Sequence, residues 1–136
     1  MRVRRLPDTP FSMDQRALIG LAASLAQPFA PSEDCTAGNV AAALVTAAGG
    51  LYTGVCVDTA CSLGFCAEHA AVAAMLGARE TVVRQIVAVS ACRVLPPCGR
   101  CRELLMQVDA RNEACRVVLG PDETVALADL LPRPWM

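Results

Sequence analysis

The chain has 136 residues, a formal net charge of −1, and a composition that is 54% hydrophobic but only 4% aromatic. This length predicts a single domain over residues 1–136, with a core of small side chains packed between layers. The arginines are scattered rather than gathered into a basic stripe, which argues against nucleic-acid binding. The longest apolar run, near residues 41–51, is too short to cross a membrane.

The N-terminal segment and the cysteines indicate a reducing compartment. Residues 1–7 are basic but precede no apolar run, so they lack the hydrophobic region of a secretory signal. A cytoplasmic location is therefore expected, where thiols stay reduced. The eight cysteines are unevenly spaced and include one C-x-x-C pair, which favours metal binding over a framework of disulfides.

The first predicted element is a helix. Apolar residues at helical spacing predict it over about residues 14–27, with Ser12 or Asp14 as its N-cap and two prolines after it. The polar segment 32–38 contains a glycine and is expected to be a loop that can reach over a pocket. Phe29, before this loop, is assigned to the core.

A hairpin and a second helix follow. Residues 39–47 and 51–57 are apolar and partly β-branched, and the Ala-Gly-Gly sequence that links them favours a turn between antiparallel strands. Tyr52 is assigned to the core. After a loop over 58–65, an alanine-rich helix is predicted from Cys66 to about Leu76, with a glycine at its end.

The remaining segments alternate between strand and helix. Residues 82–90 have the continuous apolar content of a buried strand, and the prolines after them favour extended backbone before a helix over about 98–109. Strands are then predicted over 116–119 and, more briefly, 124–126. This order predicts an α/β fold in which helices cover a mixed sheet.

Two cysteine motifs carry the clearest chemical signal, C-A-E at 66–68 and P-C-G-R-C at 97–101. Three thiolates, from Cys66, Cys98 and Cys101, fill three of the four tetrahedral positions that zinc prefers and leave one open for water, as in catalytic sites. Glu68 is then free to move protons. Both motifs begin predicted helices, whose N-termini offset the negative charge of the thiolates. The sequence therefore predicts a hydrolytic Zn²⁺ centre.

These motifs resemble those of the small zinc-dependent cytidine deaminases, a family to which blasticidin-S deaminase is related. The order of predicted elements and the L-L-P sequence at 130–132 are also similar to that family. The resemblance implies a three-layer α-β-α fold with a mixed sheet of about five strands, and a homo-oligomer that is a tetramer or a dimer. It implies hydrolysis of cytidine or deoxycytidine to uridine or deoxyuridine with release of ammonia, the chemistry of pyrimidine salvage.

The presumed substrate loop departs from the family. Cytidine deaminases commonly carry Asn-Val-Glu after the second strand, where polar side chains hold the ribose, but this chain has Cys56 and Asp58 at the two polar positions. Asp58 can accept a hydrogen bond from a sugar hydroxyl, whereas Cys56 replaces an amide poorly. Gly38 stands near the place of an aromatic that stacks on the base. A deaminase of a modified or antibiotic-like aminopyrimidine nucleoside, and a zinc-stabilised homologue without turnover, therefore remain alternatives.

The resemblance also implies roles for residues around the motifs. Phe65 and Ala67, which flank Cys66, are expected at the pocket wall. Trp135 corresponds to a terminal aromatic that shapes a pocket at a subunit interface, or else it is a frayed end. His69 replaces an arginine that often neutralises the thiolates, and Arg102 is placed to donate hydrogen bonds to sulfur. The alternatives are that His69 only packs beside the helix start and that Arg102 is a solvated helix residue. The cysteines at 35, 56, 61, 92 and 115 are assigned to core or loop.

Overall fold

The structure is a computed structural model and describes residues 13–91 and 93–136. Ser12, Cys92 and the N-terminal segment discussed above lie outside these ranges. The helices are α1 (Gln15–Leu25), α2 (Ala67–Gly77), α3 (Gly99–Val108) and α4 (Leu127–Leu130), with a 3-10 helix η1 (Ala110–Ala114). The strands are β1 (Phe29–Ser32), β2 (Cys35–Thr46), β3 (Leu51–Thr59), β4 (Val83–Ser90), β5 (Arg93–Leu95), β6 (Arg116–Gly120) and β7 (Glu123–Ala126).

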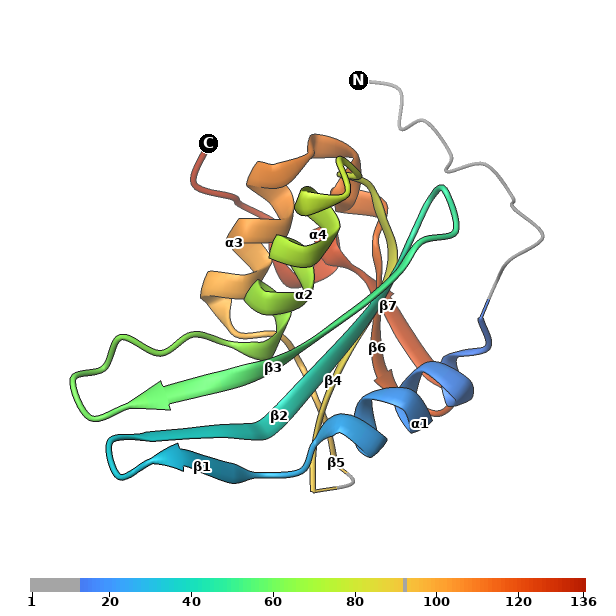
Figure 1. Cartoon of the computed structure of the whole chain (residues 1–136). Helices are drawn as coiled ribbons and strands as arrows, with labels where there is room; N and C mark the ends of the chain where they lie inside the picture. The colour runs from blue at the N-terminus through green and yellow to red at the C-terminus, as the bar shows by residue number, and fades with distance from the viewer. Residues whose placement is uncertain (1–12, 92) are drawn as a thin grey trace.

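Helices cover both faces of one sheet, with α1 on one side and α2, α3 and α4 on the other (Figure 1). Alternation along the two central strands explains this arrangement, because successive side chains of a strand point to opposite faces. Leu44 and Ile86 pack in the cluster beneath α2, whereas their neighbours Val45 and Val87 pack with Leu18 of α1. The predicted three-layer α-β-α fold is confirmed.

The sheet is organised around β2 and β4. One edge of β2 pairs with β3, and the other pairs first with β1 and then with β4, all in antiparallel orientation. The far edge of β4 pairs with β6 in parallel and with β5 in antiparallel orientation. β7 closes the order with an antiparallel pairing to β6. The sheet is therefore mixed, as predicted.

The sheet has seven strands rather than about five. The prediction of a loop over 32–38 is wrong except at residues 33–34, which form a turn, because Ser32 ends β1 and Cys35 begins β2. β1 has four residues, all exposed, so no apolar pattern reveals it, and Phe29 is 59% exposed instead of lying in the core. β5 has only three residues, within the stretch where the prolines predicted extended backbone. Tyr52 packs against the core, as expected.

Contact between β3 and α2 is close enough to exclude a side chain at Gly54. A Cβ there would lie 2.5 Å from the backbone nitrogen of Ala71 and 2.8 Å from the carbonyl oxygen of Ala67. Both atoms belong to the backbone of α2 and cannot move independently. The helix therefore lies directly against the strand, which fixes the position of Cys66 and Glu68 at its start.

Asn112 joins three segments behind the helices. Its side chain is fully buried, and its Oδ1 accepts a hydrogen bond of 2.8 Å from the backbone N–H of Val83. Its Nδ2 donates to the carbonyl oxygens of Thr81 at 3.1 Å and Leu105 at 2.9 Å. The amide thus holds the end of α3 to the start of β4.

Replacement of Asn112 by Ala is expected to lower the free energy of unfolding by about 3 kcal/mol. The substitution removes the hydrogen-bond partners of buried backbone groups, and each unsatisfied group costs about 1–3 kcal/mol. Urea denaturation followed by circular dichroism measures the change. Gln107→Ala removes an exposed amide from α3 and serves as the control, with an expected effect below about 0.5 kcal/mol. Equal effects of the two substitutions would show that Asn112 has no special structural role.

Within the described ranges, no helix is both long and apolar enough to span a bilayer.

Candidate functional site

The starts of α2 and α3 bring three cysteines together. Cys66 and Cys98 are the N-cap residues of these helices, and Cys101 lies in the first turn of α3. The sulfur of Cys98 lies 3.6 Å from that of Cys66 and 3.5 Å from that of Cys101. All three sulfur atoms lie within 4.8 Å of one another, and among the described residues this is the only such group of potential metal ligands.

The spacing and chemistry of this group fit a tetrahedral zinc ion. Zn–S bonds of about 2.3 Å place neighbouring sulfur atoms about 3.8 Å apart, close to the observed separations. Burial, first of all, raises the pKa of the Cys66 and Cys101 thiols, since thiolates are unfavourable there without compensating charge. A divalent cation between the sulfurs supplies that charge.

Cys98 differs from the other two thiols because it lies at the open end of the α3 N-terminus. Burial acts to raise its pKa, but the backbone N–H groups of Cys101 and Arg100, together with the neighbouring thiols, outweigh that effect and lower the pKa. The free N–H groups at a helix start favour negative charge. The helix therefore stabilises a thiolate at Cys98.

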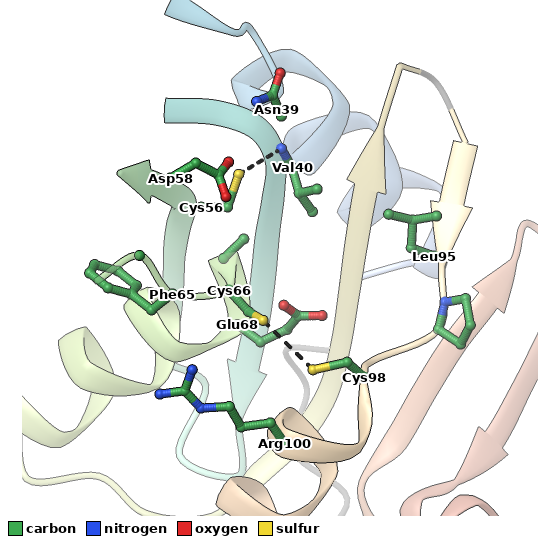
Figure 2. Close-up of a pocket in the computed structure, with 13 residues that line it drawn as sticks. Asn39, Val40, Cys56, Asp58, Phe65, Cys66, Glu68, Leu95, Cys98 and Arg100 are labelled. Atoms are coloured by element: carbon green, nitrogen blue, oxygen red, sulfur yellow. Dashed lines mark hydrogen bonds between the residues drawn. The ribbon is translucent and has the colours of Figure 1, made fainter. Parts of the chain in front are cut away.

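A cavity of about 390 Å³ opens beside the sulfurs. Its volume lies within the range of about 300–1,000 Å³ that is usual for small-molecule sites. The residues that line it are Asn39, Val40, Cys56, Asp58, Gly64, Phe65, Cys66, Ala67, Glu68, Leu95, Pro96, Cys98 and Arg100. Figure 2 shows the two ends of this pocket, with the sulfurs of Cys66 and Cys98 at one end and Asp58 near the other.

Glu68 lies at the thiol end of the pocket. It belongs to the first turn of α2, its carboxylate lies beside the sulfurs of Cys66 and Cys98, and its side chain is only 6% exposed (Figure 2). A carboxylate that lies next to a potential metal site, without being one of the three thiol ligands, is suited to accept and donate protons.

No family model and no curated protein matches the sequence. Among solved structures, a mutant cytidine deaminase from Mycobacterium tuberculosis is 30% identical over 92% of this chain and 97% of that chain, with a TM-score of 0.76. The Burkholderia pseudomallei enzyme is 30% identical over 90% and 100%, with a TM-score of 0.72. The Mycobacterium leprae enzyme is 26% identical over 90% and 100%, with a TM-score of 0.74.

The chain belongs to the cytidine deaminase family. This confirms the resemblance that the two cysteine motifs indicated. Together with the three clustered thiols, membership of this family supports a zinc-dependent deaminase.

In this member of the family, His69 contacts the thiol cluster. Its Nδ1 lies 3.4 Å from the sulfur of Cys101. Burial, and then the charge of Arg100, lowers the pKa of His69, which favours the neutral imidazole over the protonated form. With its proton on Nδ1, a neutral imidazole still donates a hydrogen bond to the sulfur.

Arg102 and Trp135 make contacts outside the pocket. Arg102 donates from Nε to the carbonyl oxygen of Pro97 at 2.7 Å and from Nη1 to that of Leu130 at 3.0 Å, so it connects the second cysteine motif to the end of α4. Trp135 is 83% exposed, and its backbone N–H donates to Glu103. A role for Trp135 at a subunit interface stays a prediction.

Of the five residues expected at the substrate pocket, four line it and the fifth, Trp135, does not. Cys56, Asp58, Phe65 and Ala67 all line it. Gly38 does not line it, and a Cβ there would lie 2.5 Å from the carbonyl oxygen of Gln27 at a backbone φ of +82°. The position of Gly38 therefore has no room for an aromatic side chain.

Sequence reasoning missed several pocket residues. The sequence predicts Asn39 only as the start of a strand and Arg100 only as part of a helix, yet both line the pocket. Leu95 lies across the pocket from Phe65 (Figure 2), and Pro96 also lines the pocket. The sequence does offer a signal for Leu95 and Pro96, because they come just before the second cysteine motif. Residues next to metal ligands in the sequence tend to lie near the reacting group.

The other described cysteines lie outside the thiol cluster. Cys115 and Cys56 are buried, Cys35 is half-buried, and Cys61 is exposed in a turn. Burial raises the pKa of Cys115 to about 12, so this thiol stays protonated at neutral pH.

Proposed function

We propose that the protein is a zinc-dependent hydrolase that converts cytidine or deoxycytidine to uridine or deoxyuridine and releases ammonia. The observation that carries this proposal is the position of the Glu68 carboxylate, which lies at the same end of one pocket as the sulfurs of Cys66 and Cys98. Membership of the cytidine deaminase family supports it. A structural zinc site has no need of a carboxylate there.

Cys66, Cys98 and Cys101 would hold the zinc ion. When bound, zinc supplies Lewis acidity that lowers the pKa of water to about 7. The N-termini of α2 and α3 stabilise the negative charge of the thiolates. With its proton on Nδ1, His69 would donate a hydrogen bond to the sulfur of Cys101 and so hold this ligand in position.

Glu68 moves the protons of the reaction. Its carboxylate accepts a proton from the attacking water and delivers it to ring nitrogen N3 while the water oxygen bonds to C4. It then accepts the proton of the new hydroxyl on C4 and transfers it to the exocyclic amino group. The bond from C4 to that nitrogen breaks, ammonia leaves, and the carbonyl of the uracil ring forms.

The remaining pocket residues position the substrate. Phe65 and Leu95 lie on facing walls, which suits a flat pyrimidine ring between them (Figure 2). Asp58 lies toward the opposite end from the thiols, where its carboxylate can accept a hydrogen bond from a sugar hydroxyl.

The proposal is tested by incubating the zinc-loaded protein with cytidine and with deoxycytidine. Loss of the cytosine absorbance and release of one ammonia for each uracil product are expected. A folded protein that holds zinc and consumes neither compound contradicts the proposal.

One observation favours a second candidate, a deaminase of a modified aminopyrimidine nucleoside. The sulfur of Cys56 already accepts a hydrogen bond of 3.2 Å from the backbone N–H of Val40, so position 56 presents no amide to a ribose. A panel of base- and sugar-modified cytidines separates the two functions. Consumption of an analogue, with cytidine and deoxycytidine inert, supports the second.

We also propose that the enzyme works in the cytoplasm as a homo-oligomer, a tetramer or a dimer. Large apolar side chains are exposed on the single chain, with Phe29 at 59%, Leu63 at 78% and Trp135 at 83%. Burial of such side chains between subunits would remove apolar surface from water. Light scattering coupled to gel filtration is expected to give a multiple of the chain mass, and a monomeric mass contradicts the proposal.

A further inference from the structure

An irregularity in β2 forms the polar end of the pocket. Ala37 pairs with Val57 and Ala41 with Val55, so residues 38–40 of β2 lie opposite Cys56 alone. This is a β-bulge with two extra residues, and Gly38 makes it possible by adopting a φ of +82°. Bulges redirect side chains beside functional sites. Here the bulge brings the Asn39 side chain to the pocket.

Cys56 lines the pocket, but its sulfur already accepts a hydrogen bond within the bulge. Its side chain is 7% exposed, and its sulfur accepts the backbone N–H of Val40, which lies within the bulge. A buried N–H without a partner is unfavourable, so the sulfur satisfies a requirement of the backbone. The polar groups that remain for a ligand at this end are those of Asn39 and Asp58.

Both of these groups are free to bind a ligand. Among the described residues, neither the amide of Asn39 nor the carboxylate of Asp58 has a protein partner. A carboxylate only accepts hydrogen bonds, whereas an amide offers two N–H donors and an acceptor. The pair therefore complements hydroxyl groups, which donate to the carboxylate and accept from the amide.

We propose that Asn39 binds a hydroxyl of the sugar and makes the pocket selective for a hydroxylated nucleoside. The inference rests on the proposed function, which places C4 of the pyrimidine at the thiol end. Ring nitrogen N1 lies across the ring from C4, so its substituent extends toward Asn39 and Asp58. The bulge of β2 thus supplies the amide that position 56 of β3 does not.

The test is steady-state kinetics of the zinc-loaded, full-length protein with cytidine, 2′,3′-dideoxycytidine and 5′-deoxycytidine. Asn39→Ala is expected to lower kcat/KM for cytidine about tenfold, mainly through KM, as for loss of one hydrogen bond. For the analogue that lacks the contacted hydroxyl, the change should be less than about twofold. Asn39→Asp keeps the shape but cannot donate, so it should resemble Asn39→Ala.

Gln107→Ala removes an amide outside the pocket and is the matched control. It should leave kcat/KM unchanged for all three substrates. Zinc content and melting temperature confirm that each variant is folded. An Asn39→Ala variant that loses no activity on cytidine, or loses it equally on all three substrates, overturns the inference. If the zinc-loaded wild type consumes no pyrimidine nucleoside, both the proposed function and the inference are wrong. If the wild type is active and Asn39→Ala is equally active, only the inference is wrong.

Discussion

Glu68→Gln is expected to lower kcat for cytidine by about 10²–10⁴-fold, the usual loss when a positioned acid-base group is removed. Glutamine has nearly the same shape, but its amide cannot accept the proton of water or deliver it to the base. The side chain is only 6% exposed, so bulk water is poorly placed to take over proton transfer. Turnover is measured by loss of the cytosine absorbance.

Two controls separate this effect from damage to the site. Zinc content should stay at the wild-type level, because Glu68 is not among the three clustered thiol ligands. Glu123→Gln makes the same chemical change at an exposed position of β7, and its turnover should match the wild type. Turnover by Glu68→Gln within a few-fold of the wild type would exclude the proposed role.

Cys101→Ser is expected to abolish stable zinc binding and, with it, the deaminase activity. The Cys101 side chain is fully buried, and a serine hydroxyl stays protonated where a thiolate is needed. Mutation of a residue that only hydrogen-bonds to a metal ligand typically weakens metal binding about 10–100-fold. Loss of a ligand itself should weaken zinc binding by more than this. Elemental analysis after dialysis against a chelator measures the retained metal.

Cys61→Ser is the matched control, because Cys61 is exposed and lies outside the thiol cluster. It should retain one zinc per chain and full activity. A Cys101→Ser protein that keeps the same zinc as this control would show that the ion is held elsewhere.

The elements that carry the thiols could be predicted because their signals are local. The C-A-E and P-C-G-R-C motifs, the alanine-rich α2 and the β2–β3 hairpin each follow from residues close together in the sequence. Asp14 caps α1 through a hydrogen bond from the backbone N–H of Arg16, as the N-cap pattern predicted. The predicted limits of the helices differ from the observed ones by at most two residues.

The bulge of β2 could not be predicted from the sequence. A strand pattern assumes regular pairing, and nothing local shows that three residues of β2 face one residue of β3. Asn39 therefore had no visible link to the pocket. β1 escaped prediction for a related reason, since its backbone pairing with β2, rather than burial of its side chains, makes it a strand.

The two ends of the pocket come from separate parts of the fold, the starts of α2 and α3 at one end and the bulged β2–β3 pair at the other. Mutations that alter the strands can therefore change which compounds are accepted while the catalytic chemistry stays intact. In evolution, and in directed evolution of this scaffold, activity on new substrates is expected to arise first through substitutions at residues 39–40 and 56–58. The tight backbone contact at Gly54 leaves the helical half little freedom to vary.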